Sequence, residues 1–374
     1  MIFPLLVALA LCVPTVVIAL LTALVLFLRK RPVRAFVQKA LWAHLFLLVF
    51  HAFVSFPGWL GWFGARSLGT RGDERAYDGP RITATGEWLV QSSTTLRAER
   101  TTPADEAVIA SARALAVSLP GAELPSGGRM TLNAYRVPAT VSPPRAVVVL
   151  VHGLFRSALE LEAPARMWRD LGCECWLVEQ RNHGHSGRAT ATFGIEEGKD
   201  LAAAVAFVQA QSSGVPVVMF GVSLGTVATS LALPQLDGIA GVVLDAPVGD
   251  VLATAQRMLS LERAGDNRRF FTLWEPWCSL AISSLQLWSG VELADVQPER
   301  ALRGLSPELP ILLIGGDGDD KVTPQSVRSL FTSLPMSEGT KELWIVPGAH
   351  HGDAWRVVPK EYGARLQAFL QRCR

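Results

Sequence analysis

The sequence predicts an α/β fold, a mainly parallel sheet with helices on both faces, preceded by one or two transmembrane helices. Three observations lead to this prediction: a long uncharged N-terminal run, a second apolar run after a short basic loop, and apolar strand-like runs that alternate with helical patterns through the rest of the chain. The chain of 374 residues is 49% hydrophobic, and its mean hydropathy of +0.28 is high for a soluble protein.

The first apolar run, Ile2 to Leu28, contains no charged residue. As a helix it would reach roughly 40 Å, more than the roughly 30 Å hydrocarbon core of a bilayer, so it can span with tilt. A signal peptide is the alternative, but its positive charges would precede the apolar stretch, whereas here they follow it. The prediction is therefore an uncleaved membrane segment.

A second uncharged run extends from Ala40 to Ala65, and we place the probable second span at residues 40–63. Trp59 and Trp62 lie near its end, where indole rings favour the membrane interface. An interfacial or re-entrant segment is the alternative, because glycines and four polar or helix-breaking residues interrupt the run: His44, His51, Ser55 and Pro57. The two histidines would share a helical face and are more typical of packing than of ligand residues.

The loop between the two runs carries basic residues and no acidic one: Arg29, Lys30, Arg31, Arg34 and Lys39. The positive-inside rule places such a loop in the cytoplasm. Two spans then put the rest of the chain on the non-cytoplasmic side. If the second run does not cross, the rest stays in the cytoplasm.

Composition argues against several other classes of protein. Lys and Arg number 35 against 33 Asp and Glu, which provides no basic field for a nucleic acid. The five cysteines show neither a zinc-site spacing nor a disulfide framework. We therefore expect no nucleic-acid partner and no metal, and no protein partner is evident.

After residue 65 the sequence predicts a linker and then a helix over residues 102–119, with a Thr cap and a Pro in the first turn. Helical patterns at 197–211 and 225–233 separate several of the strand-like runs that follow, at residues 130–139, 145–153, 173–180, 215–223, 240–247, 309–317 and 341–350. Ligands of such sheets bind outside the carboxyl ends of the strands. The residues that follow each run are therefore the candidates for function.

Ser223 stands in GVSLG, between a strand-like run and a predicted helix. A nucleophilic hydroxyl has to project from a tight strand-to-helix turn, and the small residues Gly221 and Gly225 allow the backbone to bend that sharply. The alternative is a small residue in an ordinary turn. The context favours a nucleophile.

A base and an acid for Ser223 come from two later loops. His350 and His351 end the last run and are candidate bases, with His183 and His185 ranked behind them as turn-shaping residues. The loop after residue 314 offers the acids Asp317, Asp319 and Asp320. The spacing from Gly316 favours Asp319, counting back from Pro324 favours Asp320, and Asp245 is a competitor outside this loop. The backbone N–H groups of Leu154 and Leu224 are the candidate oxyanion donors.

The order of these motifs resembles the α/β-hydrolase fold, and most closely its lysophospholipase-like and acylglycerol-lipase-like branch, also called serine aminopeptidase-type hydrolases. The motifs are HG at 152–153, QRNHGHS at 180–186, GVSLG at 221–225, GDGDDKVTP at 316–324 and PGAHHGD at 347–353. The resemblance implies a triad of Ser223, Asp319 and His351 and no cofactor. Two departures are Glu179 with Gln180, where the family often has a DxRGHG-like opening, and one extra residue before Pro324.

These expectations divide the chain into a membrane segment (1–65), a linker and helix (66–129) and a catalytic domain (130–374) with a small cap-like insertion at about 250–305. The aromatic stretch 270–290 is either a core helix on the sheet or an acyl-chain groove or membrane-facing cap. Candidate substrate-binding residues are Phe155, Trp274 and Trp277. The expected activity is cleavage of a lipid ester such as a lysophospholipid or acylglycerol. Acyl transfer, thioester or peptide cleavage, and a non-catalytic membrane scaffold are the alternatives.

Overall fold

The computed structural model describes residues 2–70, 115–154, 156–259 and 276–373. Its internal contacts divide the chain into two compact units. A helical unit combines Met1–Ser67 with Ala255–Val291, and a sheet unit combines Leu68–Thr254 with Glu292–Arg374. The boundaries show that part of the predicted insertion at 250–305 folds with the N-terminal helices.

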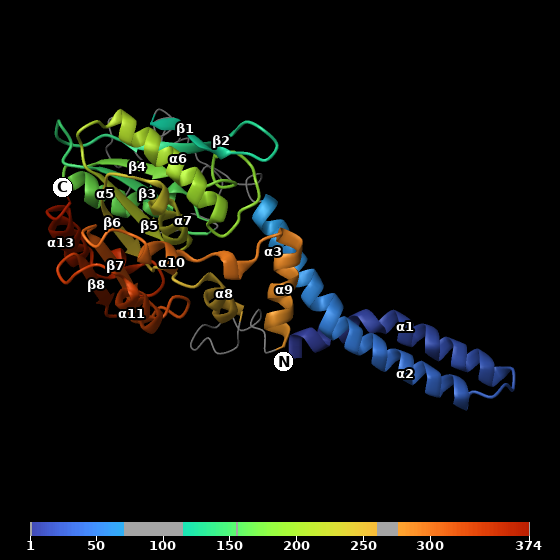
Figure 1. The fold of residues 1–374 in the computed structure, drawn as a ribbon. Coiled ribbons are helices and arrows are strands. Elements are labelled where there is room, and N and C mark those ends of the chain that lie inside the picture. The colour runs from blue at the N-terminus through green and yellow to red at the C-terminus, as the bar shows by residue number, and fades with distance from the viewer. Residues whose placement is uncertain (1, 71–114, 155, 260–275, 374) are drawn as a thin grey trace, which may run out of the picture. The chain divides into compact units, whose positions relative to one another are not determined.

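The N-terminal helices of the helical unit are α1 (Ile2–Leu28), α2 (Arg34–Phe50), a π-helical turn (His51–Ser55) and α3 (Phe56–Thr70), and α1 and α2 lie side by side (Figure 1). The bounds of α1 are those predicted. The α2, π-helical and α3 segments together run from residue 34 to residue 70 and extend beyond the predicted span of 40–63 at both ends. Residues 66–70, expected as linker, are therefore helical. Arg and Lys are good helix formers, and their charge does not end a helix. By length and composition, Arg34–Arg66 can cross a membrane.

The π-helical turn lies just before Pro57. The N–H of Phe56 donates to the carbonyl of His51, five residues earlier, instead of the usual four. Proline has no N–H to give, and its ring would clash with the carbonyl four residues before it. A local π-helical turn lets the helix continue through Pro57. His44 and His51 form hydrogen bonds within this helix, His44 Nδ1 with Ala40 O at 2.6 Å and His51 Nδ1 with Ser55 Oγ at 3.0 Å.

Helix α9 (Trp277–Ser289) packs on the π-helical turn and on α3. The Trp277 indole Nε1 donates to Ala52 O at 2.8 Å, and its ring stacks on Phe53 with centroids 5.1 Å apart. Ser284 Oγ donates to Gly58 O at 3.1 Å. A Cβ at Gly61 would lie 2.4 Å from the Ser284 Cβ, so the helices are in contact at their backbones. The expectation of a core helix on the sheet is therefore wrong for residues 277–289.

The sheet unit contains an eight-stranded sheet in the order β1-β2-β4-β3-β5-β6-β7-β8. The strands are β1 (Ala116–Glu123), β2 (Arg129–Val137), β3 (Val147–Val151), β4 (Glu174–Val178), β5 (Val217–Val222), β6 (Ile239–Asp245), β7 (Ile311–Gly316) and β8 (Lys341–Val346). β1 and β2 pair antiparallel, β2 joins β4 antiparallel, and the pairs from β4 through β8 are parallel. The predicted mainly parallel sheet is confirmed.

Helices cover both faces of this sheet (Figure 1). They include α5 (Glu162–Asp170), α6 (Ile195–Gln211), α7 (Leu224–Ala232), α10 (Pro298–Arg303), α11 (Pro324–Ser333), α12 (Ala354–Val357) and α13 (Pro359–Leu370), with short 3-10 turns at Ala158–Leu161, Leu233–Gln235 and Leu293–Asp295. Helix α8 (Val251–Leu259) runs from the sheet unit into the helical unit. Trp168 of α5 and Phe369 of α13 join one buried cluster with the strands, and α6 packs against α7. Every residue of β3, β4 and β5 is buried, as expected for strands covered on both faces.

Strand β1 corrects the predicted helix over 102–119. Residues 116–119 belong to this strand, which pairs Ala116 with Tyr135 and Leu119 with Leu132. Leu119 is 1% exposed. Pairing with β2 and burial of alternate side chains therefore outweigh the helical propensity of the segment. Residues 102–114 lie outside the described residues.

Candidate active site

Ser223 lies at a sharp turn between β5 and α7, with φ of 52° and ψ of −120°. A non-glycine residue with positive φ is strained, and such strain concentrates at functional sites. A Cβ at Gly221 would lie 2.7 Å from Gly225 O, and one at Gly225 would lie 2.3 Å from Val151 O. Both glycines are therefore required by close backbone approach, which is the physical reason for the GxSxG spacing.

The loop after β8 brings His351 to this serine. Its Nε2 is 2.7 Å from Ser223 Oγ, and its Nδ1 is 2.7 Å from Asp319 Oδ2. His350 forms other bonds, because its Nδ1 contacts Gly318 O at 2.8 Å and its N–H donates to Asp353 Oδ1 at 2.6 Å. Of the two candidate bases, His351 is the one in contact with the serine.

Asp319 is buried in the loop after β7. Its Oδ1 accepts from the N–H groups of Lys321 and Val322, both at 2.9 Å, which leaves Oδ2 for His351. Asp317 instead accepts from Gly348 N at 2.7 Å and joins the two loops. The contact with His351 favours Asp319 over Asp320, which the sequence alone left open.

Asp245, the competing acid at the end of β6, has a different partner. It is 2% exposed, and the Tyr362 hydroxyl donates to its Oδ2 at 2.7 Å. Burial raises the pKa of Asp245 to about 7, although the Tyr362 hydrogen bond and the nearby His351 lower it. Asp245 is thus a buried acid behind the site, and its hydrogen bond with Tyr362 holds the C-terminal helix α13 in place.

The loop after β3 approaches the serine from a second side. His152 is fully buried, its Nε2 accepts from Gln180 N at 3.1 Å, and its Nδ1 bonds Gly153 O at 2.8 Å. Since a carbonyl only accepts, Nδ1 carries the hydrogen. Gly153 and then Leu154 follow, and a Cβ at Gly153 would lie 3.3 Å from the Ser223 Cβ. Phe155 lies outside the described residues.

Leu224, the other candidate oxyanion donor, is the first residue of α7. The N–H groups of the first helical turn have no acceptor within their own helix, and they lie at its positive end. The structure therefore places both predicted donors on segments that reach Ser223. Their role toward a substrate stays a prediction.

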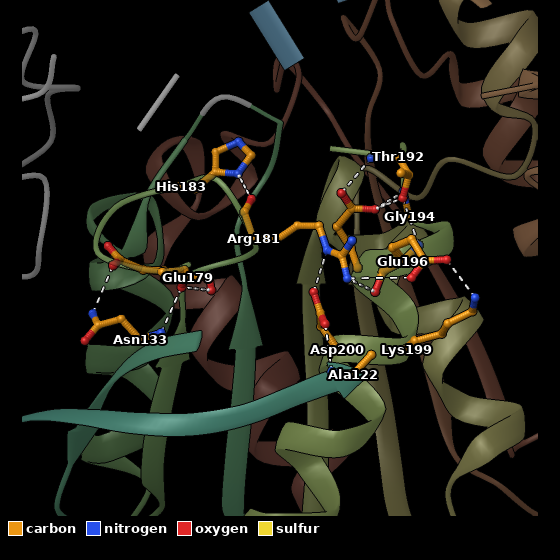
Figure 2. A network of polar contacts seen from close by, with 12 residues as sticks. Ala122, Asn133, Glu179, Arg181, His183, Thr192, Gly194, Glu196, Lys199 and Asp200 are labelled. Atoms are coloured by element: carbon orange, nitrogen blue, oxygen red, sulfur yellow. Dashed lines mark hydrogen bonds and ion pairs between the residues drawn. The ribbon is translucent and has the colours of Figure 1, made fainter. Parts of the chain in front are cut away.

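The loop at 180–187 is held by a network of polar contacts (Figure 2). Arg181 Nε donates to Asp200 Oδ2 at 2.6 Å, and Glu179 Oε2 accepts from Asn133 Nδ2 at 2.9 Å and from His185 N at 2.8 Å. The ring of His183 packs on that of His152, with centroids 5.0 Å apart. Glu179, which departs from the family pattern, therefore helps to hold this loop in place.

Trp274 and Trp277 are the two tryptophans predicted to bind substrate. Trp274 lies outside the described residues. Trp277 belongs to the helical unit, where it is 6% exposed and bound to Ala52 and Phe53. Its part in substrate binding stays a prediction.

Glu160 is a residue that the sequence analysis missed. Its Oε2 accepts from Gly153 N at 2.6 Å, and Arg156 Nε is 3.4 Å from its Oε1. Burial raises the pKa of Glu160, against opposing effects of the Gly153 hydrogen bond, Arg156, His351 and Lys321. The segment ALELE around it carries no motif. Only the contact with Gly153 reveals its place beside the site.

A hydroxyl, an imidazole and a carboxylate in a hydrogen-bonded row can remove a proton from the hydroxyl and make it a nucleophile. Tetrahedral oxyanions formed by such an attack require backbone N–H donors, and two are on neighbouring segments. Among the described residues, no group of three or more His, Cys, Asp or Glu side chains is arranged to hold a metal ion.

Residues 142–303 match the family described as serine aminopeptidase, S33. The chain is also 24% identical to the uncharacterized protein YqkD of Bacillus subtilis, over 66% of this chain and 77% of that protein.

Several solved structures of esterases share the fold. The esterase Pf2001 of Pyrococcus furiosus has a TM-score of 0.56 at 19% identity and covers 80% of this chain and 98% of its own. A thermostable carboxyl esterase from Bacillus coagulans, solved with glycerol, has a TM-score of 0.52 at 15% identity over 68% of this chain and 98% of its own. These structures show the α/β-hydrolase fold, and the family match over residues 142–303 supports a hydrolase of this type.

Proposed function

We propose that this protein is a serine hydrolase that cleaves an ester through an acyl-enzyme on Ser223. The observation that carries the proposal is the row of two 2.7 Å contacts, from Ser223 Oγ to His351 Nε2 and from His351 Nδ1 to Asp319 Oδ2, on a strained strand-to-helix turn. The similarity to the S33 family and to esterase structures supports the reaction class.

In the first half of the reaction, Ser223 Oγ attacks the ester carbonyl while His351 Nε2 takes its proton. Asp319 holds the Nδ1–H of His351 and stabilises the imidazolium that forms. The carbonyl oxygen gains a negative charge, which the N–H groups of Leu154 and Leu224 stabilise. When the intermediate collapses, the bond to the leaving alcohol breaks and His351 returns the proton to that alcohol.

In the second half, water takes the place of the alcohol. His351 removes a proton from the water, whose oxygen attacks the acyl carbon, and the acid is released as Ser223 regains its proton. An alcohol or amine in place of water would make the protein an acyltransferase. A thioester or a peptide as donor would use the same groups.

A lipid ester is the proposed substrate, and a membrane anchor is part of the proposal. The support is an apolar helix from Arg34 to Arg66 and a second from Ile2 to Leu28. Many large apolar side chains of these helices are more than half exposed, among them Leu20, Leu24, Leu41, Trp42, Phe46 and Trp59. Anchoring would bring the site close to lysophospholipids or acylglycerols.

The proposed orientation places the loop with Arg29 to Arg34 in the cytoplasm and the sheet unit on the other side. A reporter fused after Arg374 should then behave as external. A cytoplasmic reporter would show that the second helix does not cross.

Labelling with a fluorophosphonate probe tests the activity. The wild-type chain should be labelled and Ser223→Ala should not, with Ser326→Ala, an exposed serine on α11, as a matched control that keeps labelling. Folded wild-type protein that resists the probe would favour a non-catalytic scaffold. If labelling occurs, incubation with a lipid extract and mass spectrometry identify the acyl donor. Cleavage of a short soluble ester with all lipids intact would count against the lipid proposal.

A further inference from the structure

We propose that Glu160 is a positioning residue that sets the direction of the Leu154 N–H toward the substrate oxyanion. The inference rests on the proposed function, because it assigns a role in that reaction. Glu160 acts through the backbone of Gly153 and makes no contact with the reacting atoms itself.

The peptide groups around Gly153 are held from two sides. The Gly153 N–H donates to Glu160 Oε2 at 2.6 Å, and the Gly153 carbonyl accepts from His152 Nδ1 at 2.8 Å and from Arg156 N at 3.2 Å. A trans peptide group is planar, so the N–H of Leu154 points opposite to the carbonyl of Gly153. Fixing that carbonyl therefore fixes the direction of the Leu154 N–H.

Glu160 holds a residue that lies close to the serine. A Cβ built on Gly153 would lie 3.2 Å from Glu160 Oε2 and 3.3 Å from the Ser223 Cβ. Glycine lets the loop approach the serine this closely, but it also has the greatest backbone freedom. The bond to Glu160 fixes the peptide group before Gly153, and the bonds to the Gly153 carbonyl fix the peptide group after it. Together they restrict that freedom without adding a side chain that would fill the space.

Positively charged or ionisable groups around Glu160 favour its ionised form. Arg156 on the same loop is 3.4 Å away, and His351 and Lys321 act on it from the opposite loops. Burial raises its pKa while these neighbours lower it. An amide oxygen could accept the Gly153 N–H equally well, so the position needs an acceptor more than it needs a charge.

Three variants test this inference: Glu160→Ala, Glu160→Gln and the control Glu299→Ala, which breaks a surface ion pair with Arg303 on α10. Glu160→Ala should lower kcat about tenfold or more with KM within about twofold, because an oxyanion donor acts in the transition state. Glu160→Gln should restore kcat to within about threefold of wild type. Glu299→Ala should match wild type.

A trifluoromethyl ketone, which forms a tetrahedral oxyanion adduct on an active serine, gives a readout that a purely structural role would not move. Its affinity should fall in Glu160→Ala by the same factor as kcat/KM, with an unchanged unfolding midpoint. Wild-type kcat in Glu160→Ala, equal losses in Ala and Gln variants, or unchanged ketone affinity would overturn the inference while the hydrolase stands. A wild-type chain that neither turns over esters nor takes the fluorophosphonate would remove the proposed function and this inference with it.

Discussion

The helical unit and the sheet unit use apolar residues in opposite ways. Helix α2 has no buried residue, and its Leu41 and Phe46 are 66% and 68% exposed. In β3 and β5 every residue is buried. The sheet unit thus builds its own core, whereas the N-terminal helices expose apolar surface, which supports the proposed membrane anchor.

The units also differ in how they treat polar groups. The sheet unit buries the carboxyl groups of Asp245 and Asp319 and gives each a hydrogen-bonding partner. In the helical unit, the hydroxyl groups of Thr15 and Thr22 donate hydrogen bonds to carbonyls of their own helix, Cys12 O and Ile18 O, each at 2.8 Å. Long-range polar contacts assemble the candidate site of the sheet unit, whereas these two threonines of α1 satisfy their hydroxyl groups within their own helix.

The largest expected effect concerns the long-range contact of Asp319. Asp319→Asn should lower kcat about 10⁴-fold, because the imidazole of His351 would be held in the wrong tautomer. Asp320→Asn is the matched control and should stay within about tenfold of wild type in the same ester assay. Equal, mild losses in both variants would direct attention to Asp245.

The next prediction concerns backbone packing at the turn that carries Ser223. Gly225→Ala would place a Cβ 2.3 Å from Val151 O and should destabilise the sheet unit by about 3 kcal/mol or more in urea unfolding. Gly363→Ala, in α13, meets nothing within 4 Å and should be neutral or stabilising by up to about 1 kcal/mol. A stable, active Gly225→Ala variant would contradict the packing account of the turn.

The buried acid Asp245 predicts a pH dependence. Its pKa in the folded protein, about 7, lies above the usual 3.8, so its contribution to stability is complete below pH 4 and is lost as the pH rises toward 7. The Asp245→Asn variant can still accept the hydrogen bond from Tyr362. Its free energy of unfolding should rise relative to that of wild type by about 1.4 kcal/mol per pH unit over that range, and the difference should then stay constant. Unfolding free energies of both proteins from pH 4 to 9 measure this. A constant difference would refute the raised pKa.

The smallest effect is expected in the helical unit. Gly61→Ala would put a Cβ 2.4 Å from Ser284 and should separate α9 from α3 at a cost of about 1 to 2 kcal/mol. Gly58→Ala meets nothing within 4 Å and serves as the control. Thermal unfolding of both variants in detergent compares them, and equal midpoints would argue against close contact of the two helices.

Much of the fold and site could be predicted because local pattern carries the information. Strand runs, the glycines around Ser223 and the bounds of α1 follow from residue type and spacing. Strand β1 was missed because pairing with β2 decides its state. The partner of α9 was missed because apolar aromatic residues suit several surfaces, and only the contacts of Trp277 and Ser284 identify it.

The sequence by itself determined the α/β class, the order of the motifs and the identity of the candidate nucleophile, because these depend on periodicity and on residues close in the chain. Residue spacing left His350 and His351, and Asp319 and Asp320, as alternatives, and the family resemblance pointed to His351 and Asp319. Only the tertiary structure brought these two side chains into contact with each other and with Ser223, and revealed Glu160. Those choices depend on atoms brought within hydrogen-bonding distance from separate loops, and a contact across 128 positions, as between Ser223 and His351, leaves no local pattern.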